Sequence, residues 1–418
     1  MVALSWPVDA EGAPLPGISD AGPPLWSRWA EAFQVFKADG GPPDPWNGAG
    51  RSIPDIGAIE RPRENGTLLG FERVPPEFTV PPIDSGNARI LHNLSAIGPL
   101  NVLDEVNQAF SSPVWDQNGN MVHYEILINE EQYDYIVDNE LYDIEGQVEF
   151  FRRQSKLDFP RGRFGTDRKG AIELKLAWKI MDPERDDLGR YVTMPAYVPS
   201  GPADPHWQPA IMGLVGFHIA QKTESSPQWI WSTFEHVDNV EVDLLDTVRV
   251  NGEETPLLPS FNDPYCAWCP VNVVPTPDDR GVSRTQVTRL VPIMDSTRRL
   301  NATMQARLAE QGSRLQYYEL VGVQWPVFPE LPPADPNDFP GAVTNKSGGE
   351  PFPTYLVNSV METYSQNGNL PADQHQMAIA TSDRLVFGTA SCMGCHASAP
   401  SDDFSWIMIK AQPRRAPP

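Results

Sequence analysis

The sequence predicts an α+β protein with an antiparallel, β-rich core, surrounding helices and long proline-rich loops. Candidate strands follow one another closely in the middle of the chain, which favours an antiparallel meander over βαβ units. Proline is abundant, with 44 among 418 residues, and indicates many turns because it interrupts helix interiors and central strands alike. We expect residues 1–340 to form the body, with residues 341–418 packed on it as part of one compact unit.

The amino-terminal third predicts two helices and a hairpin. Residues 24–37 carry aromatic side chains at helical spacing and end before Gly40, which predicts a helix whose apolar stripe enters the core. The pair Asn118-Gly119 lies between two apolar runs and is typical of a hairpin turn. A second helix is expected over residues 130–139.

The middle of the chain predicts the strands. Apolar residues alternate with Glu and Lys over residues 172–180, which indicates a strand with one buried face and one wet face. Three further apolar segments read as strands, although Pro195 weakens the first of them. These segments span residues 191–198, 211–221 and 229–236.

The last third predicts a helix from residue 295 or 296 to residue 311, with Gly312 as its stop. A strand over residues 315–325 should follow. Two short elements complete the chain, a helical stretch over residues 357–364 and an apolar segment over residues 404–411.

The C-terminal segment contains the motif Cys-x-x-Cys-His, formed by Cys392, Cys395 and His396. Two thiols at this spacing can each add to one haem vinyl group, and the adjacent imidazole then lies under the iron as its proximal ligand. A structural disulfide or half of a zinc site are the alternatives, but no third and fourth cysteine lie nearby. We therefore expect one covalently attached haem c in residues 341–418.

A second cysteine pair, Cys266 and Cys269, is predicted to form a disulfide that closes a tight loop. A redox-active dithiol is the alternative, although no βαβ pattern of the thioredoxin kind surrounds the pair. No histidine follows Cys269, so the pattern does not indicate a second covalent haem.

The sixth iron ligand is not evident from the sequence. Few residues follow His396, and the one methionine among them, Met408, lies in an apolar run typical of a core element. His218 and His236 are the favoured distal candidates because each lies in an apolar β segment, although a lone histidine on a strand is more often a satisfied core residue than a ligand. Glu235 and Asp238 flank His236 and could complete an acid–base set there. The other candidates are His92, His123, His206, His375, Met361 and Met377.

The formal net charge of −23 bears on partners. Nucleic acids and anionic membranes are disfavoured, whereas a basic redox protein or a cationic substrate is favoured. No run approaches the ~18 apolar residues of a membrane span. The first residues lack the basic and apolar regions of a signal peptide. Because haem c is attached outside the bacterial cytoplasm, we expect a periplasmic or secreted protein whose leader has been removed.

Several runs of the chain resemble one family, the large exported single-haem bacterial proteins called the "cytochrome c family", whose function is unassigned. The resemblance lies in residues 213–219, 222–223, 227–239 and 391–396, with shorter matches at 4–7, 324–326, 361–364 and 403–405. It implies an exported protein with thioether bonds at Cys392 and Cys395 and an iron ligand at His396. It implies no particular reaction.

Three functions are consistent with the sequence. The first is an electron-transfer cytochrome that docks with a protein partner. The second is a haem enzyme, a peroxidase or an oxygenase, in which the body builds a pocket for a small-molecule substrate over an open distal iron site. The third, a haem-based sensor, requires an output surface that no sequence feature indicates. We expect a redox role, with electron transfer ahead of an enzyme.

Overall fold

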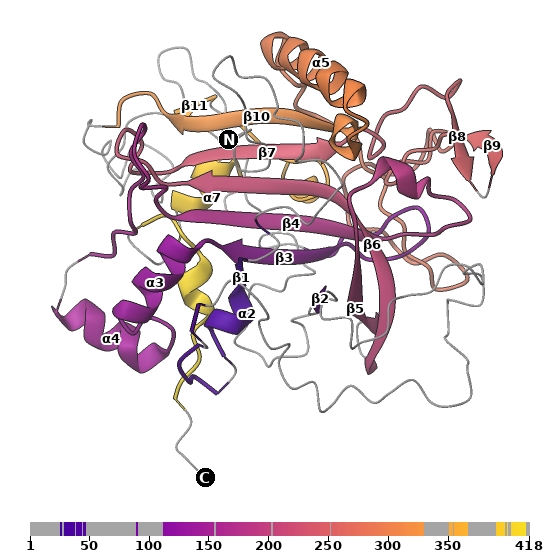
Figure 1. Cartoon of the computed structure of the whole chain (residues 1–418). Helices are drawn as coiled ribbons and strands as arrows, with labels where there is room; N and C mark the ends of the chain where they lie inside the picture. The colour runs from indigo at the N-terminus through magenta and orange to yellow at the C-terminus, as the bar shows by residue number, and fades with distance from the viewer. Residues whose placement is uncertain are drawn as a thin grey trace.

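A curled sheet of nine strands forms the centre of the molecule (Figure 1). Its main path runs β1-β3-β4-β6-β7-β10-β11, and β5 pairs with both β6 and β2. Every described pair is antiparallel except β2 with β5. The chain is therefore α+β, as predicted. In this computed structural model the described residues are 26, 29–37, 39–43, 45–46, 89–90, 112–153, 156–201, 204–250, 252–329, 351–353, 355–366, 390–397, 399 and 403–414.

The predicted strands are confirmed, with shifts at their ends. The strand expected over residues 172–180 is β4 without change. The strand expected to begin at residue 211 begins earlier, because the first half of β6 bends away to form a hairpin with β5 (Figure 1). The strands are β1 (Ala30–Glu31), β2 (Arg89–Ile90), β3 (His123–Ile128), β4 (Ile172–Ile180), β5 (Thr193–Gly201), β6 (Asp204–Gln221), β7 (Ile230–His236), β10 (Tyr318–Pro326) and β11 (Pro351–Phe352).

The expectation of a wet face on β4 was wrong. Glu173 and Lys179 are both buried, and Lys179 binds Asp186 through a contact of 2.7 Å from Nζ to Oδ1. Other parts of the chain cover both faces of the sheet, so the polar positions of β4 meet polar partners instead of water. Alternation by itself cannot distinguish these two environments.

Burial of Glu173 predicts a pH-dependent stability. Burial raises the pKa of its carboxyl to about 7, against hydrogen bonds from Ser405 and Gln132 that lower it. The folded pKa exceeds the unfolded one, so the native state holds the proton more tightly. The stability from this group is complete below the unfolded pKa and is lost as pH rises through 7.

Glu173→Gln is therefore expected to be more stable than wild type at pH 8, by an amount on the order of 3 kcal/mol, and nearly equal at pH 4.5. Urea unfolding at the two pH values measures this difference. An advantage of Glu173→Gln that stays the same at both pH values would contradict the prediction.

The helices show one error and one omission. The helix expected over residues 24–37 is shorter than predicted: among its described residues only Ala32–Val35 form an α-helix (α2), because β1 pairs with β3 just before it. Trp26 and Trp29 are nevertheless buried, as their spacing suggested. α4 (Ile144–Arg153) was not predicted.

Two other helices and the hairpin are confirmed. α3 (Glu130–Asp138) begins after Asn129, whose side chain accepts a hydrogen bond from the backbone of Gln132. α5 (Asp295–Glu310) ends before Gly312, where φ is +65°, a conformation that suits glycine. The turn at Asn118-Gly119 joins Trp115 and Met121, which pair in an antiparallel bridge.

Short elements complete the described chain. The stretch expected over residues 357–364 is helical only at its end, in η6. The apolar element expected over 404–411 contains η8. These short elements are η4 (Leu188–Arg190), β8 (Thr247–Val250), β9 (Glu253–Pro256), η5 (Arg314–Tyr317), η6 (Thr363–Ser365), α7 (Cys392–Ala397) and η8 (Ile407–Lys410).

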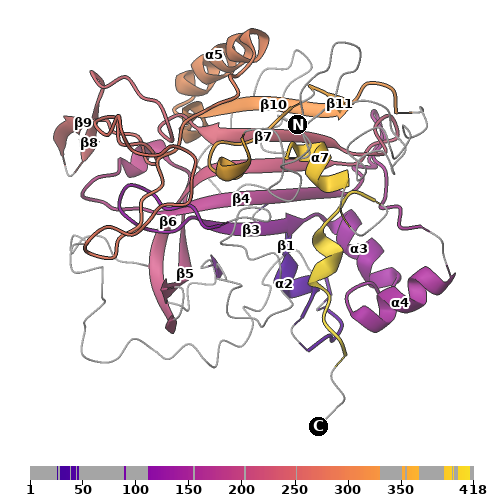
Figure 2. The same cartoon turned by 180° about the vertical axis from the view of Figure 1, so that it is seen from behind.

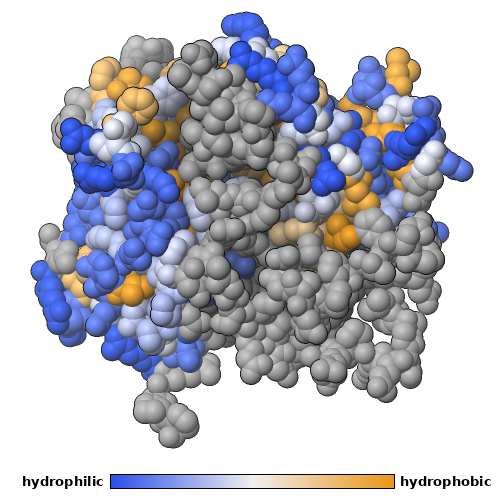
Figure 3. Space-filling model, in the orientation of Figure 1, coloured by the Kyte–Doolittle hydropathy of each residue, from blue (hydrophilic) through white to orange (hydrophobic). Residues whose placement is uncertain are grey.

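The described surface is largely hydrophilic on the face drawn in Figure 3, with hydrophobic residues gathered beside the β8–β9 hairpin. Leu245 there is 90% exposed. Among the described residues, no helix combines the length and the apolar character that crossing a membrane would require.

Residues 390–397 and 403–414, the described part of the chain's end, lie across one face of the sheet, beside α3 (Figure 2). Among them, Met393, Ala397 and Met408 share a buried cluster with Trp229 and Trp231 near β7. The motif at residues 392–396 is therefore built into the main core of the body.

Candidate functional site

α7 contains the whole Cys-x-x-Cys-His motif, and the neighbouring chain holds its first turn. The backbone N–H of Cys392 donates to the carbonyl of Leu356 at 3.0 Å. The N–H of Met393 donates to Oε1 of Gln324, in β10, at 2.8 Å. The N–H of Gly394 donates to Oγ of Ser391 at 3.3 Å. These contacts satisfy donors that a helix start leaves open and dock α7 on the sheet.

The two thiols of the motif are free rather than joined to each other. Burial raises the pKa of Cys392 well above its ordinary value and the pKa of Cys395 to about 12. Both therefore remain protonated at neutral pH in this environment, unlike the exposed thiolates of dithiol redox sites.

His396 has a defined tautomer. Its Nδ1 lies 2.8 Å from the backbone oxygen of Phe404. A carbonyl only accepts, so Nδ1 carries the proton and donates, and Nε2 keeps its lone pair. Burial lowers the pKa of His396 to about 3, which keeps the ring neutral. A neutral imidazole with one anchored nitrogen and one free lone pair is suited to bind a metal.

His218, in β6, lies on the sheet face that meets α7. Its cross-strand neighbours are Lys175 in β4 and Thr233 in β7. Its Nε2 lies 2.8 Å from Oε1 of Glu362, and its buried Nδ1 has no hydrogen-bond partner among the described residues. The charges of His218 and Lys175 also lower the pKa of His396. The structure thus brings His218 to the motif.

Glu362 is the acidic member of this group. Burial would raise its pKa, but the His218 side chain, followed by Lys175, brings the pKa below its ordinary value. Its carboxylate in turn raises the pKa of both Cys392 and Cys395. An ionised carboxylate, a histidine and two thiols therefore share one electrostatic environment.

His236 is not brought to the motif. It lies on the opposite face of β7, where its ring is stacked 3.9 Å from that of Tyr191. Its Nε2 lies 3.0 Å from the carbonyl oxygen of Arg190, and its Nδ1 accepts from the N–H of Asp238. Both nitrogens are engaged, so His236 is a satisfied core histidine in this fold.

The acid–base set suggested around His236 does not form either. Asp238 binds the Arg190 guanidinium through two contacts of 2.6 Å. Glu235 lies on the other face of β7 and binds Ser359 and Arg289. Strand alternation places Glu235 and His236 on opposite faces of β7, whereas Asp238 follows the strand and lies beside His236, with 3.8 Å from Oδ2 to Nδ1.

The remaining ligand candidates lie elsewhere. His123 is buried on the face opposite α7, and burial lowers its pKa to about 4. Met361 and Met408 pack in hydrophobic clusters. The side chains of His92, His206, His375 and Met377 lie outside the described residues.

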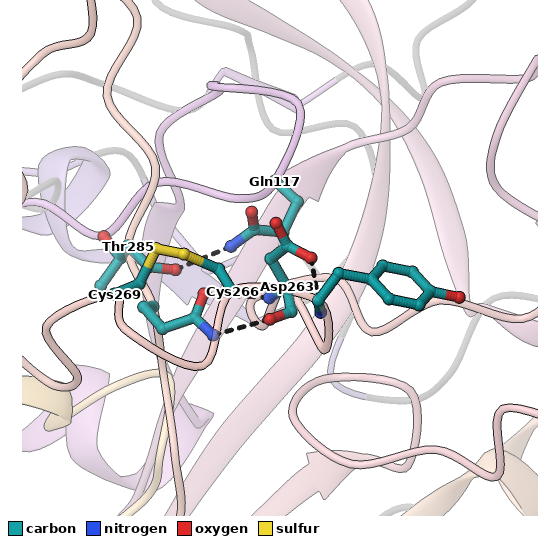
Figure 4. Close-up of a disulfide and its surroundings, with 7 residues drawn as sticks. Gln117, Asp263, Cys266, Cys269 and Thr285 are labelled. Atoms are coloured by element: carbon teal, nitrogen blue, oxygen red, sulfur yellow. Dashed lines mark hydrogen bonds between the residues drawn. A yellow bond between two sulfur atoms is a disulfide. The ribbon is translucent and has the colours of Figure 1, made fainter.

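Cys266 and Cys269 form a disulfide with an S–S distance of 2.00 Å (Figure 4). The loop is held by Asp263, whose carbonyl accepts from the N–H of Cys266 at 3.1 Å. Trp268 between the two cysteines is 82% exposed. The disulfide and the motif thus differ in bonding and in burial.

Sequence reasoning missed four charged residues near the motif. Lys175 and Glu362 join His218, while Lys222 and Asp403 lie behind the loop that contacts His396. Lys175 interrupts an apolar strand, and Lys222, Glu362 and Asp403 lie in runs that carry the resemblance, but neither signal indicates a role at the motif. Their partners are too distant in the chain for any local pattern to reveal.

Comparison with protein-family models, with curated proteins and with solved structures finds no match to this chain.

Proposed function

We propose that this chain is an exported c-type cytochrome with one covalent haem, which exchanges electrons with a protein partner. The observation that carries the proposal is the state of His396, whose Nδ1–H is anchored on the Phe404 carbonyl while Nε2 keeps its lone pair. The free thiols of Cys392 and Cys395 in the same helix support it. The resemblance to exported single-haem proteins agrees with this function.

The residues present fit a haem. Cys392 and Cys395 would form the thioether bonds, and Nε2 of His396 would bind the iron. The buried Nδ1 of His218, without a partner among the described residues, is the best candidate for a second iron ligand. The haem itself would supply one-electron redox chemistry.

The roles of the other side chains follow from their contacts. The carbonyl of Phe404 keeps the proton on Nδ1 of His396. This hydrogen bond makes Nε2 a more basic ligand for a metal. Glu362 fixes the ring of His218 through Nε2. Trp231, whose ring centroid lies 4.0 Å from that of His396, restricts water around the imidazole.

The partner in this proposal is a basic redox protein, because the net charge of −23 attracts positive surfaces and repels anionic ones. The location would be the periplasm or the outside of the cell, where haem c is attached. Association should weaken as salt is added, because screening shortens the range of surface charge.

A haem enzyme, a peroxidase or an oxygenase, is the second candidate. One observation favours it: His218 and Glu362 form a hydrogen-bonded pair of 2.8 Å beside the motif, as an acid–base group requires. In this alternative His218 would leave the iron open and move protons for a small-molecule substrate.

Export of the chain in a host that matures c-type cytochromes tests the proposal. We expect haem that stays bound through denaturing electrophoresis and a reduced c-type spectrum that carbon monoxide does not change. A Soret shift with the gas would favour the enzyme over the electron carrier. Absence of covalent haem would contradict both.

A pair of variants tests the distal assignment. His218→Leu is expected to make the reduced haem bind carbon monoxide, because it removes the side chain that would be the second iron ligand. His123→Leu is a matched control, since His123 is also a strand histidine whose buried Nδ1 has no partner among the described residues. Equal behaviour of the two variants would exclude His218 as the ligand.

A further inference from the structure

Lys222 is a buried lysine directed at the loop that contacts His396. It is 1% exposed and follows directly on the end of β6. Its Nζ lies 2.5 Å from each carboxylate oxygen of Asp403 and 2.5 Å from Oδ1 of Asp158. Its backbone N–H donates to Ala171 at 3.0 Å, which fixes the chain from which the side chain extends. The position of the ammonium group is therefore set by the sheet.

Asp403 connects the fixed ammonium group of Lys222 to the loop of residues 403–405. Its Oδ2 also accepts from the backbone N–H of Phe159 at 2.5 Å. Its own carbonyl accepts from Nε1 of the buried Trp229 at 3.0 Å. Both the side chain and the backbone of Asp403 are thus held by the body.

Phe404, the next residue, has φ of +60°, a left-handed conformation that is uncommon for a residue other than glycine. Ser405, which follows Phe404, is also fixed in place. Its Oγ donates to the carboxylate of Glu173 at 2.5 Å and accepts from the N–H of Ile407. The backbone of Phe404 is therefore constrained from both ends. Its carbonyl is the one that accepts from Nδ1 of His396 at 2.8 Å.

We infer that Lys222 and Asp403 form a positioning pair for His396. The pair holds the Phe404 carbonyl in place, and that carbonyl sets the tautomer and the donor strength of the imidazole. The inference rests on the proposed function for its redox consequence. A hydrogen-bonded imidazole is the more basic ligand and favours the oxidised iron, so loss of the pair raises the reduction potential.

The main experiment compares two buried lysines, each changed to methionine. Lys179 is the matched control because it is 2% exposed and binds Asp186 at 2.7 Å and Ser260 at 3.0 Å, away from residues 403–405. Spectroelectrochemistry of the haem-loaded proteins measures the midpoint potential. Lys222→Met is expected to favour reduction by about tenfold, which is 59 mV for a one-electron couple. Lys179→Met should leave the potential unchanged.

A second measurement needs no haem. Nitrogen-15 histidine NMR of the unloaded chain reports which ring nitrogen of His396 carries the proton. We expect the Nδ1–H tautomer in wild type and in Lys179→Met, and a mixture in Lys222→Met. If wild type carries no covalent haem, the proposed function is overturned but the inference about Lys222 and Asp403 is not. The NMR result would then decide whether these two residues position His396.

If Lys222→Met does not fold, the double variant Lys222→Met/Asp403→Asn replaces it in both measurements. The double variant removes both charges of the pair, so neither is left buried without its partner. An unchanged potential and an unchanged tautomer in the Lys222 variants would overturn the inference. Unfolding of both Lys222 variants, with Lys179→Met folded, would also overturn it, because Lys222 would then serve the fold rather than the histidine.

Discussion

Replacing Cys392 and Cys395 together with serine is expected to abolish covalent haem while leaving the fold intact. Serine has nearly the same shape but cannot form a thioether bond. The Sγ of Cys392 donates to the Leu356 carbonyl at 3.4 Å, a hydrogen bond that a serine hydroxyl can also make. We expect a stability cost of roughly 1–3 kcal/mol for each serine whose buried hydroxyl lacks a full set of partners. Haem staining after denaturing electrophoresis and thermal unfolding measure the two effects.

The chain supplies its own control in Cys266→Ser/Cys269→Ser. This variant should keep its haem, because the disulfide loop lies outside α7. Its expected cost is about 2 kcal/mol or less, because so short a loop removes little entropy from the unfolded chain. Covalent haem that survives in the Cys392/Cys395 variant would show that the attachment residues are assigned wrongly.

Glu235→Ala is expected to cost roughly 3–5 kcal/mol of folding free energy, the range for removing one partner of a buried ion pair. Glu235 is 0% exposed and accepts from both terminal nitrogens of Arg289, at 3.3 Å and 2.7 Å. It also accepts from the backbone N–H of Ser359 at 2.6 Å. Its loss leaves the guanidinium poorly paired and removes the Ser359 contact between residues 355–366 and β7, while Asn358 still donates to Thr233 and Phe234.

Glu319→Ala is the matched comparison for Glu235→Ala. Glu319 binds the same Arg289 at 3.3 Å but its side chain is 26% exposed, so its loss should cost about 1 kcal/mol or less. Chemical denaturation of both variants measures the difference. Equal costs would mean that the Ser359 contacts of Glu235 contribute nothing to stability.

Most of the sheet was predictable because strand signals are local. Residues 172–180 alternate over their whole length and form β4 with the predicted ends. The prediction of a helix over residues 24–37 was too long. The aromatic spacing there suits a helix, but Ala30 and Glu31 pair with β3 as strand β1 instead. Local periodicity reports which side chains become buried, and Trp26 and Trp29 are buried in either conformation.

Part of the candidate site was likewise predictable from local sequence, and part was not. The motif at residues 392–396 and the cysteine pair at 266 and 269 are readable because a few adjacent positions define each chemistry. Choosing between His218 and His236 was beyond local pattern, since both lie in apolar strands. The choice depends on which face of the sheet α7 covers.

The sequence by itself determined the candidate attachment motif, the antiparallel α+β class and the acidic character of the chain. Only the tertiary structure decided which distant side chains meet at the motif. His218 and Glu362 are separated by 144 residues, and Lys222 and Asp403 by 181. Such contacts arise when strands pair and the C-terminal segment docks on one face, and no period or spacing within the chain encodes that choice of face.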